Sequence, residues 1–145
     1  MRRGIVVVSA VLLTVQLTGC EPYLFRQSDR VQVTTPATYS SVTEPLTIRW
    51  QAQDFSPPQD GSYAVFIDRD PMPPGDNLSD FGPNDRDGIY VTRSTSLHLS
   101  LLSPQPGVDP AERNHHDVTV VLLDSQGNRI GEYAGFTEFT VSNGP

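Results

Sequence analysis

Apolar residues recur at every second position along the chain after residue 30, and this period constrains the fold more than any other feature. The clearest stretch is LTIRWQAQ, in which Leu46, Ile48 and Trp50 alternate with polar residues. Successive side chains of an extended strand point to opposite faces, so the pattern is typical of a strand with one buried face. We interpret Trp50 as an anchor of the core.

Six further segments have the spacing or composition of strands. The segment YAVFI, residues 63–67, is apolar on both faces, which predicts a central position in a sheet. In TSLHLSL, residues 95–101, the three leucines fall on one face. The parity of the apolar residues shifts between Phe136 and Phe139, which we interpret as a bulge. The strand candidates are residues 31–34, 46–53, 63–67, 89–92, 95–101, 118–123 and 136–141.

Seven candidate strands with no helical window after residue 20 predict an all-β domain. An antiparallel sandwich is the expected architecture, and a small barrel is the alternative. The only cysteine of the 145 residues is Cys20, so the domain has no disulfide. Between Leu123 and the last strand, residues 124–128 predict a turn in which Gly127 and Asn128 can adopt positive φ.

The first 20 residues have the features of a secretion signal. Arg2 and Arg3 supply the positive charge, and residues 5–17 form an apolar run that ends in small residues. A bilayer-spanning helix needs about 20 apolar residues, so this run is too short to remain as a span.

The sequence Leu17-Thr18-Gly19-Cys20 resembles the lipobox of bacterial lipoproteins at every position. The resemblance implies cleavage between Gly19 and Cys20, a diacylglyceryl group on the Cys20 sulfur, and acylation of the new amino terminus. Two acyl chains are enough for stable anchoring. The alternatives are an ordinary signal peptide with an incidental cysteine and a loose transmembrane anchor.

The lipobox resemblance defines three regions. Residues 1–19 are a cleaved signal peptide, residues 20–30 a lipid-anchored tether, and residues 31–145 one sandwich domain. We expect the protein on the extracytoplasmic face of the cell membrane, or on the outer membrane if the organism has one. Glu21 agrees with that location, because it is not the aspartate that favours retention at the inner membrane.

The exported part is acidic. Removing residues 1–20 takes away two arginines and no acid, so the formal charge changes from −7 to −9. Nucleic acids and anionic headgroups require a basic patch, so neither is an expected partner. We expect no cofactor.

Three segments resemble the immunoglobulin-like modules of bacterial surface proteins and lipoproteins. A first strand ends at Pro36, a second follows Pro45, and a late strand runs into an Asp-x-x-Gly turn at Gly127. The chain departs from antibody domains because it lacks paired cysteines and carries Trp50 on the second strand. The resemblance implies adhesion, spacing or ligand binding, without one fixed activity.

The segment DRDPMPPGDNLSDFGPNDRDG, residues 68–88, is a long acidic loop, and long loops are often functional. Clustered carboxylates suit Ca²⁺, although the prolines do not fit an EF-hand loop. The alternative is a solvated acidic loop stiffened by proline. The candidate metal ligands are Asp68, Asp70, Asp85 and Asp87, and the candidate contact residues are Asp76, Asp80 and Phe81.

Other sites receive less support from the sequence. On an extended strand His115 and Asp117 share one face while His116 takes the other. In an immunoglobulin-like strand order His98 belongs to the opposite sheet, so we expect no transition-metal site. No nucleophile motif is present, and we expect no enzyme. The aromatic candidates for stacking on sugars are Tyr63, Tyr90, Tyr133 and Phe81.

The predicted function is therefore a non-catalytic binding or scaffolding module at the bacterial cell envelope. Its partner would be another envelope protein or a glycan. The alternative is a lipoprotein that binds a divalent cation or a carbohydrate through the loop of residues 68–88.

Overall fold

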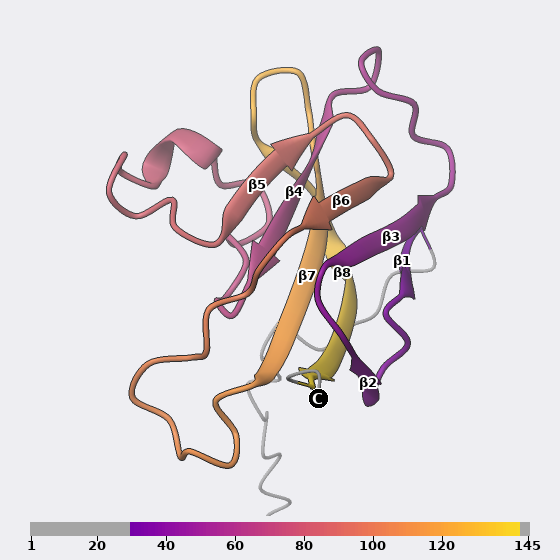
Figure 1. Ribbon diagram of the computed structural model, residues 1–145. Coiled ribbons are helices and arrows are strands. Elements are labelled where there is room, and N and C mark those ends of the chain that lie inside the picture. Colours follow the sequence, from indigo (N-terminus) through magenta and orange to yellow (C-terminus); the bar gives the residue numbers. More distant parts are fainter. Residues whose placement is uncertain (1–29, 143–145) are drawn as a thin grey trace, which may run out of the picture.

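The computed structural model describes residues 30–142 (Figure 1). The predicted signal peptide, Cys20 and the tether up to residue 29 lie outside the described residues, as do residues 143–145. The strands are β1 (Val31–Thr35), β2 (Ser40–Val42), β3 (Leu46–Ala52), β4 (Ser62–Ile67), β5 (Ile89–Thr92), β6 (Ser96–Leu99), β7 (His115–Leu123) and β8 (Arg129–Val141), with a short 3-10 turn at Leu78–Asp80.

The strands form two sheets, in the orders β1-β3-β6 and β2-β8-β7-β4-β5. All strand pairs are antiparallel except β2 with β8. The larger sheet lies behind the smaller one in the view of Figure 1. This order is that of an immunoglobulin-like sandwich, so the predicted fold class is confirmed and the barrel alternative is wrong.

The core lies between the sheets and contains Trp50, which confirms its role as an anchor. The Trp50 and Tyr63 rings meet edge to face at 5.5 Å, and Phe55 contacts Tyr63 at 5.3 Å. Such aromatic pairs stabilise a core beyond the area that they bury. Tyr63 is therefore buried, and its prediction as a sugar-stacking residue is wrong.

Two strand predictions need correction. The strand β6 ends at Leu99, so Leu101 does not join the leucine face and is 70% exposed. The strand β8 begins at Arg129. Its pairing register with β7 shifts at residues 131–134, where four residues of β8 face the single residue Val121 of β7. Phe136 and Phe139 pair regularly with β7 and point to opposite faces, so no bulge separates them.

A second apolar cluster covers the outer face of the larger sheet. Phe66 and Val121 project outward, and the loop of residues 68–88 places Met72 on them with 1% exposure. Arg129 Nη1 donates to the Met72 carbonyl, and Leu78 N donates to Gly127 O at 2.9 Å. The loop is thus packed and hydrogen-bonded, although most of its aspartates remain exposed.

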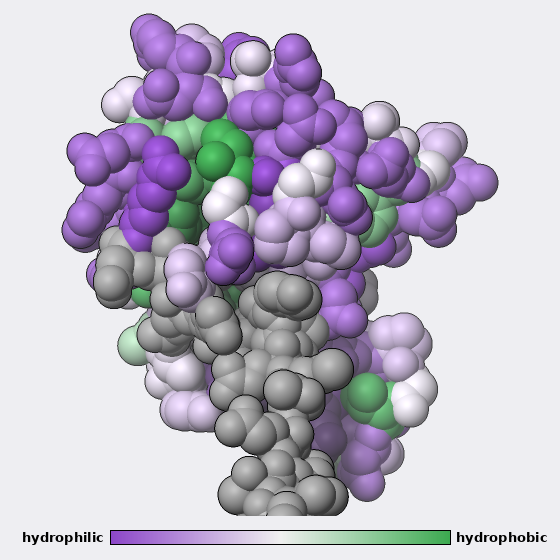
Figure 2. Space-filling view, turned by 180° about the vertical axis from the view of Figure 1, so that it is seen from behind, coloured by the Kyte–Doolittle hydropathy of each residue, from purple (hydrophilic) through white to green (hydrophobic). Residues whose placement is uncertain are grey.

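The remaining surface is mainly hydrophilic on the side shown in Figure 2. Within residues 30–142 the structure contains no helix with the length and apolar character needed to cross a bilayer.

Candidate functional site

The outer face of the larger sheet carries a groove of about 310 Å³ at the end where β4 stops and β7 begins. Its floor comes from alternate residues of two strands, and its walls come from residues 69–71 and from Gln105 in the β6–β7 loop. We call this site the carboxylate groove. The floor residues are His115, Asp117 and Thr119 of β7 with Phe136 and Glu138 of β8.

Strand periodicity and register bring these side chains together. Residues 115, 117 and 119 share the outer face of β7 because side chains alternate along a strand. Across the sheet Asp117 pairs with Glu138 and Thr119 pairs with Phe136. The floor is therefore held by the most extensively paired strands of the fold.

The groove has an excess of negative charge. Asp117 and Glu138 lie opposite each other, and like charges in that position destabilise a sheet. Burial raises the pKa of the Asp117 carboxyl, and the carboxylates of Asp68 and Asp70 raise it further. His115 also contacts this pair, because its Nε2 lies 3.1 Å from Glu138 Oε2, within hydrogen-bond distance.

The guanidinium of Arg69, which also lines the groove, is engaged by the acidic loop. Its Nη1 donates to the carbonyls of Asp85 at 2.6 Å and Asp87 at 2.7 Å, and it lies over the Phe81 ring at 5.1 Å. The Arg69 guanidinium is therefore held by residues of the acidic loop. The charge of the groove favours a ligand that carries a basic group.

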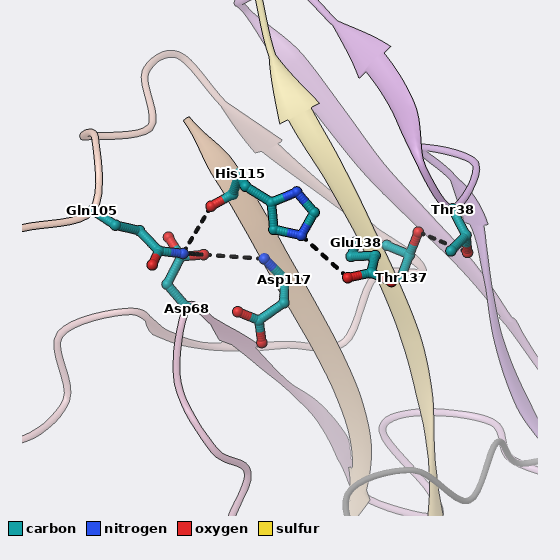
Figure 3. A network of polar contacts seen from close by, with 7 residues as sticks. All are labelled: Thr38, Asp68, Gln105, His115, Asp117, Thr137 and Glu138. Carbon is teal, nitrogen blue, oxygen red and sulfur yellow. Dashed lines mark hydrogen bonds and ion pairs between the residues drawn. The ribbon is translucent and has the colours of Figure 1, made fainter. Parts of the chain in front are cut away.

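One wall of the groove is fixed by Asp68, as Figure 3 shows. Its Oδ1 accepts hydrogen bonds from Gln105 Nε2 at 2.8 Å and from Asp117 N at 3.1 Å. Its Oδ2 lies 2.7 Å from His116 Nδ1. The same Gln105 nitrogen also donates to His115 O at 2.8 Å. Asp68 adopts φ 54°, which an aspartate tolerates better than most residues do.

The four predicted metal ligands are not gathered at one point. Asp70 lines the groove and Asp68 supports its wall, whereas Asp85 and Asp87 are exposed and use their carbonyls to hold Arg69. Residues 30–142 contain no group of three or more histidine or carboxylate side chains arranged to hold a metal ion. The calcium hypothesis stays a prediction, and a thermal melt with and without Ca²⁺ tests it.

The three predicted contact residues have structural partners. Asp80 Oδ2 accepts from Asn77 N at 3.1 Å and caps the 3-10 turn. Asp76 O accepts from Arg129 N at 2.8 Å, and Phe81 packs on Phe66 at 6.0 Å. The carboxylates of Asp76 and Asp80 are exposed, so both remain candidates for a contact.

The predicted faces of the histidines are confirmed. His115 lies over the outer face of β7, and His116 is buried with Phe139 at a ring distance of 6.0 Å. His98 is exposed on β6 in the other sheet, where its Nδ1 lies 3.2 Å from Thr47 Oγ1.

Sequence reasoning missed Gln105, Phe136 and Glu138. The alternation in residues 136–141 could have placed Phe136 and Glu138 beside Asp117, had the bulge been located correctly. Nothing local in the sequence indicates Gln105, because its contact with Asp68 joins residues 37 positions apart.

The chain enters the domain at the opposite end from the groove. Val31 pairs with Ala52 at the end of β3, and Arg30 Nη2 donates to Asp54 O at 2.9 Å. From there β4 runs toward the groove, because its first residue pairs with Leu123 and its last with Val118. The β3–β4 loop and the β6–β7 loop lie at opposite ends in Figure 1.

No protein-family model matches the chain, and no curated protein matches it. Among solved structures it is similar to the fibronectin(III)-like modules of Clostridium thermocellum CbhA, with 12% identity and a TM-score of 0.45. The alignment covers 79% of this chain and 99% of that chain. The assignment of the fold rests on the strand order described above, since so low a score adds nothing to it.

Proposed function

We propose that the protein is a lipid-anchored, extracytoplasmic module that binds another component of the bacterial cell envelope without catalysing a reaction. The carboxylate groove is its binding site. A protein partner that presents a lysine or arginine side chain fits the charge of this groove best.

The observation that carries the proposal is the position of the groove relative to the point where the chain enters the domain. Arg30 lies beside the β3–β4 loop, whereas the groove lies where β4 ends. A domain held through Cys20 would present the groove away from the bilayer. The ten Cα–Cα steps from Cys20 to Arg30 could span up to about 35 Å, which leaves the domain clear of the membrane surface.

A non-catalytic role agrees with the burial of the aspartate–histidine pair. The contact of Asp68 with His116 has the geometry of two members of a catalytic triad. However, the His116 side chain is 1% exposed and packs against Phe139, so a substrate cannot reach its ring. We therefore propose that the Asp68–His116 contact stabilises the fold and takes no part in catalysis.

Site-specific photocrosslinking in the native envelope tests the proposal. The full chain carries p-benzoylphenylalanine either in place of Phe136, in the groove, or in place of Gln59, which is exposed in the β3–β4 loop at the other end. We expect one discrete crosslinked species from position 136 and none from position 59. Equal crosslinking at both positions, or none at position 136, would contradict the groove as the binding site.

A further inference from the structure

A second groove, of about 510 Å³, lies at the same end of the domain between the edge strand β5 and residues 101–106. Arg69 and Gln105 line both grooves and separate them. Its volume is that of an ordinary small-ligand site. We call it the Tyr90 groove, after the residue that β5 contributes.

Exposed apolar side chains line the Tyr90 groove on both sides. Tyr90 is 39% exposed and Leu101 is 70% exposed, and both are among the few large apolar side chains that reach the described surface. Tyr90 lies on β5 and Leu101 lies in the β6–β7 loop, yet they line the same groove together with Pro104 and Pro106. A tyrosine ring beside prolines offers a flat, rigid platform that loses little conformational entropy when a ligand binds.

The polar residues that line the groove are held by backbone hydrogen bonds. Arg69 donates to the Asp87 carbonyl, and the next residue, Gly88, accepts from Ile67 N at 2.8 Å. Gly88 has φ 75°, and a Cβ there would lie 2.7 Å from Ile67 O, so the backbone position is specific to glycine. The Asp87 carboxylate is exposed beside Tyr90 and makes no side-chain hydrogen bond to any of residues 30–142.

An aromatic ring and an exposed carboxylate in one groove match the chemistry of a sugar ring. A pyranose has an apolar C–H face that stacks on an aromatic ring and hydroxyl groups at its edge that donate to a carboxylate. The net charge of the exported chain is −9, which disfavours anionic polysaccharides. A peptide that adds a strand is disfavoured because β5 has only four residues.

We infer that the Tyr90 groove binds a neutral pyranose oligosaccharide, stacked on Tyr90 and hydrogen-bonded to Asp87. This second site is independent of the carboxylate groove, and a loss of sugar binding would leave the crosslink from position 136 unchanged.

Isothermal titration calorimetry of the full-length protein in detergent tests the inference, with chitotetraose and maltotetraose as neutral probes and tetragalacturonate as the anionic control. We expect saturable binding of at least one neutral probe and none of the anion. Loss of the stacking ring in Tyr90→Ala should weaken binding about tenfold or more. Tyr90→Phe should retain it.

Tyr133→Ala is the matched control, because Tyr133 is 45% exposed and lies outside the groove. It should bind the sugar like the unaltered protein, and all variants should melt within a few degrees of it. The inference is overturned if neither neutral probe binds saturably, if tetragalacturonate binds equally well, or if Tyr90→Ala and Tyr133→Ala bind alike.

Discussion

Asp68 joins three segments of the chain through one carboxylate. It accepts hydrogen bonds from the β6–β7 loop through Gln105 and from the β7 backbone through Asp117 N, and it faces the buried His116 ring. These contacts fix the wall that separates the two grooves. The sequence predicted a metal ligand at this position, and in the structure both oxygens of the carboxylate have protein partners.

We expect Asp68→Ala to lower the free energy of unfolding by about 2–4 kcal/mol, because it removes the acceptor of the Asp117 N–H and the partner of the buried His116 ring. Chemical denaturation measures this. Asp54→Ala is the control, since Asp54 also has a positive φ, 50°, but is exposed. It carries the same backbone cost without the hydrogen bonds. Equal losses in the two variants would show that the backbone conformation alone matters.

The Asp117 carboxylate contributes negative charge to the proposed binding groove, but as a charged group it lowers the stability of the fold. Burial and the neighbouring carboxylates of Asp68 and Asp70 raise its pKa. A raised pKa means that the folded state binds the proton more tightly than the unfolded state does. The contribution of Asp117 to stability therefore falls as the pH rises from the ordinary aspartate range through the raised value.

Asp117→Asn should consequently raise the melting temperature at pH 7 and have little effect below about pH 3.9, where aspartate is protonated even when unfolded. Thermal melts of both proteins across this pH range measure the difference. Asp87→Asn, at an exposed aspartate, should change stability little at any pH. A destabilised Asp117→Asn protein at pH 7 would contradict the assigned cause.

At the scale of elements, the acidic loop is a cover for the larger sheet. Met72 provides its buried anchor, and Asn77 ties it to the β7–β8 turn through Gln126 O at 2.9 Å and Asn128 Oδ1 at 2.8 Å. The exposed aspartates of the loop are thus held in place by its contacts with the larger sheet and the β7–β8 turn.

Met72→Ala should cost about 2–4 kcal/mol of unfolding free energy, since it opens a cavity under the loop. Leu101→Ala, at a side chain that is 70% exposed, should cost less than about 0.5 kcal/mol. Chemical denaturation compares the two variants. A Met72→Ala protein as stable as Leu101→Ala would show that the loop does not pack in solution.

The sequence predicted strands well where apolar and polar residues alternate locally. It predicted them less well where pairing with a distant strand determines the structure. The β5 boundaries match residues 89–92, and β4 has the predicted central place between β5 and β7. The strand β2 was missed because its three residues, SSV, depend on β8 for their pairing. Gly127 has the expected positive φ of 85°, whereas the four residues 131–134 follow a register that no local pattern specifies.

The candidate site was predictable only in part for the same reason. Asp70 belonged to a visible acidic run, and the faces of His115 and Asp117 followed from strand alternation. The groove itself arises from the register of β7 with β8 and from the long-range contact of Gln105 with Asp68. Both are tertiary features, which composition and periodicity do not encode.

At the scale of the whole molecule, the two ends of the sandwich differ. The chain enters beside the β3–β4 loop, and both grooves lie at the other end of the sandwich. Such an arrangement is useful to a protein fixed to a surface at one end. The proposal thus depends on lipid at Cys20.

The intact mass of the protein purified from its native membrane tests this claim most directly. We expect a chain that begins at Cys20 and carries a diacylglyceryl group, with residues 1–19 absent. A chain that retains residues 1–19 and has a free Cys20 thiol would contradict it.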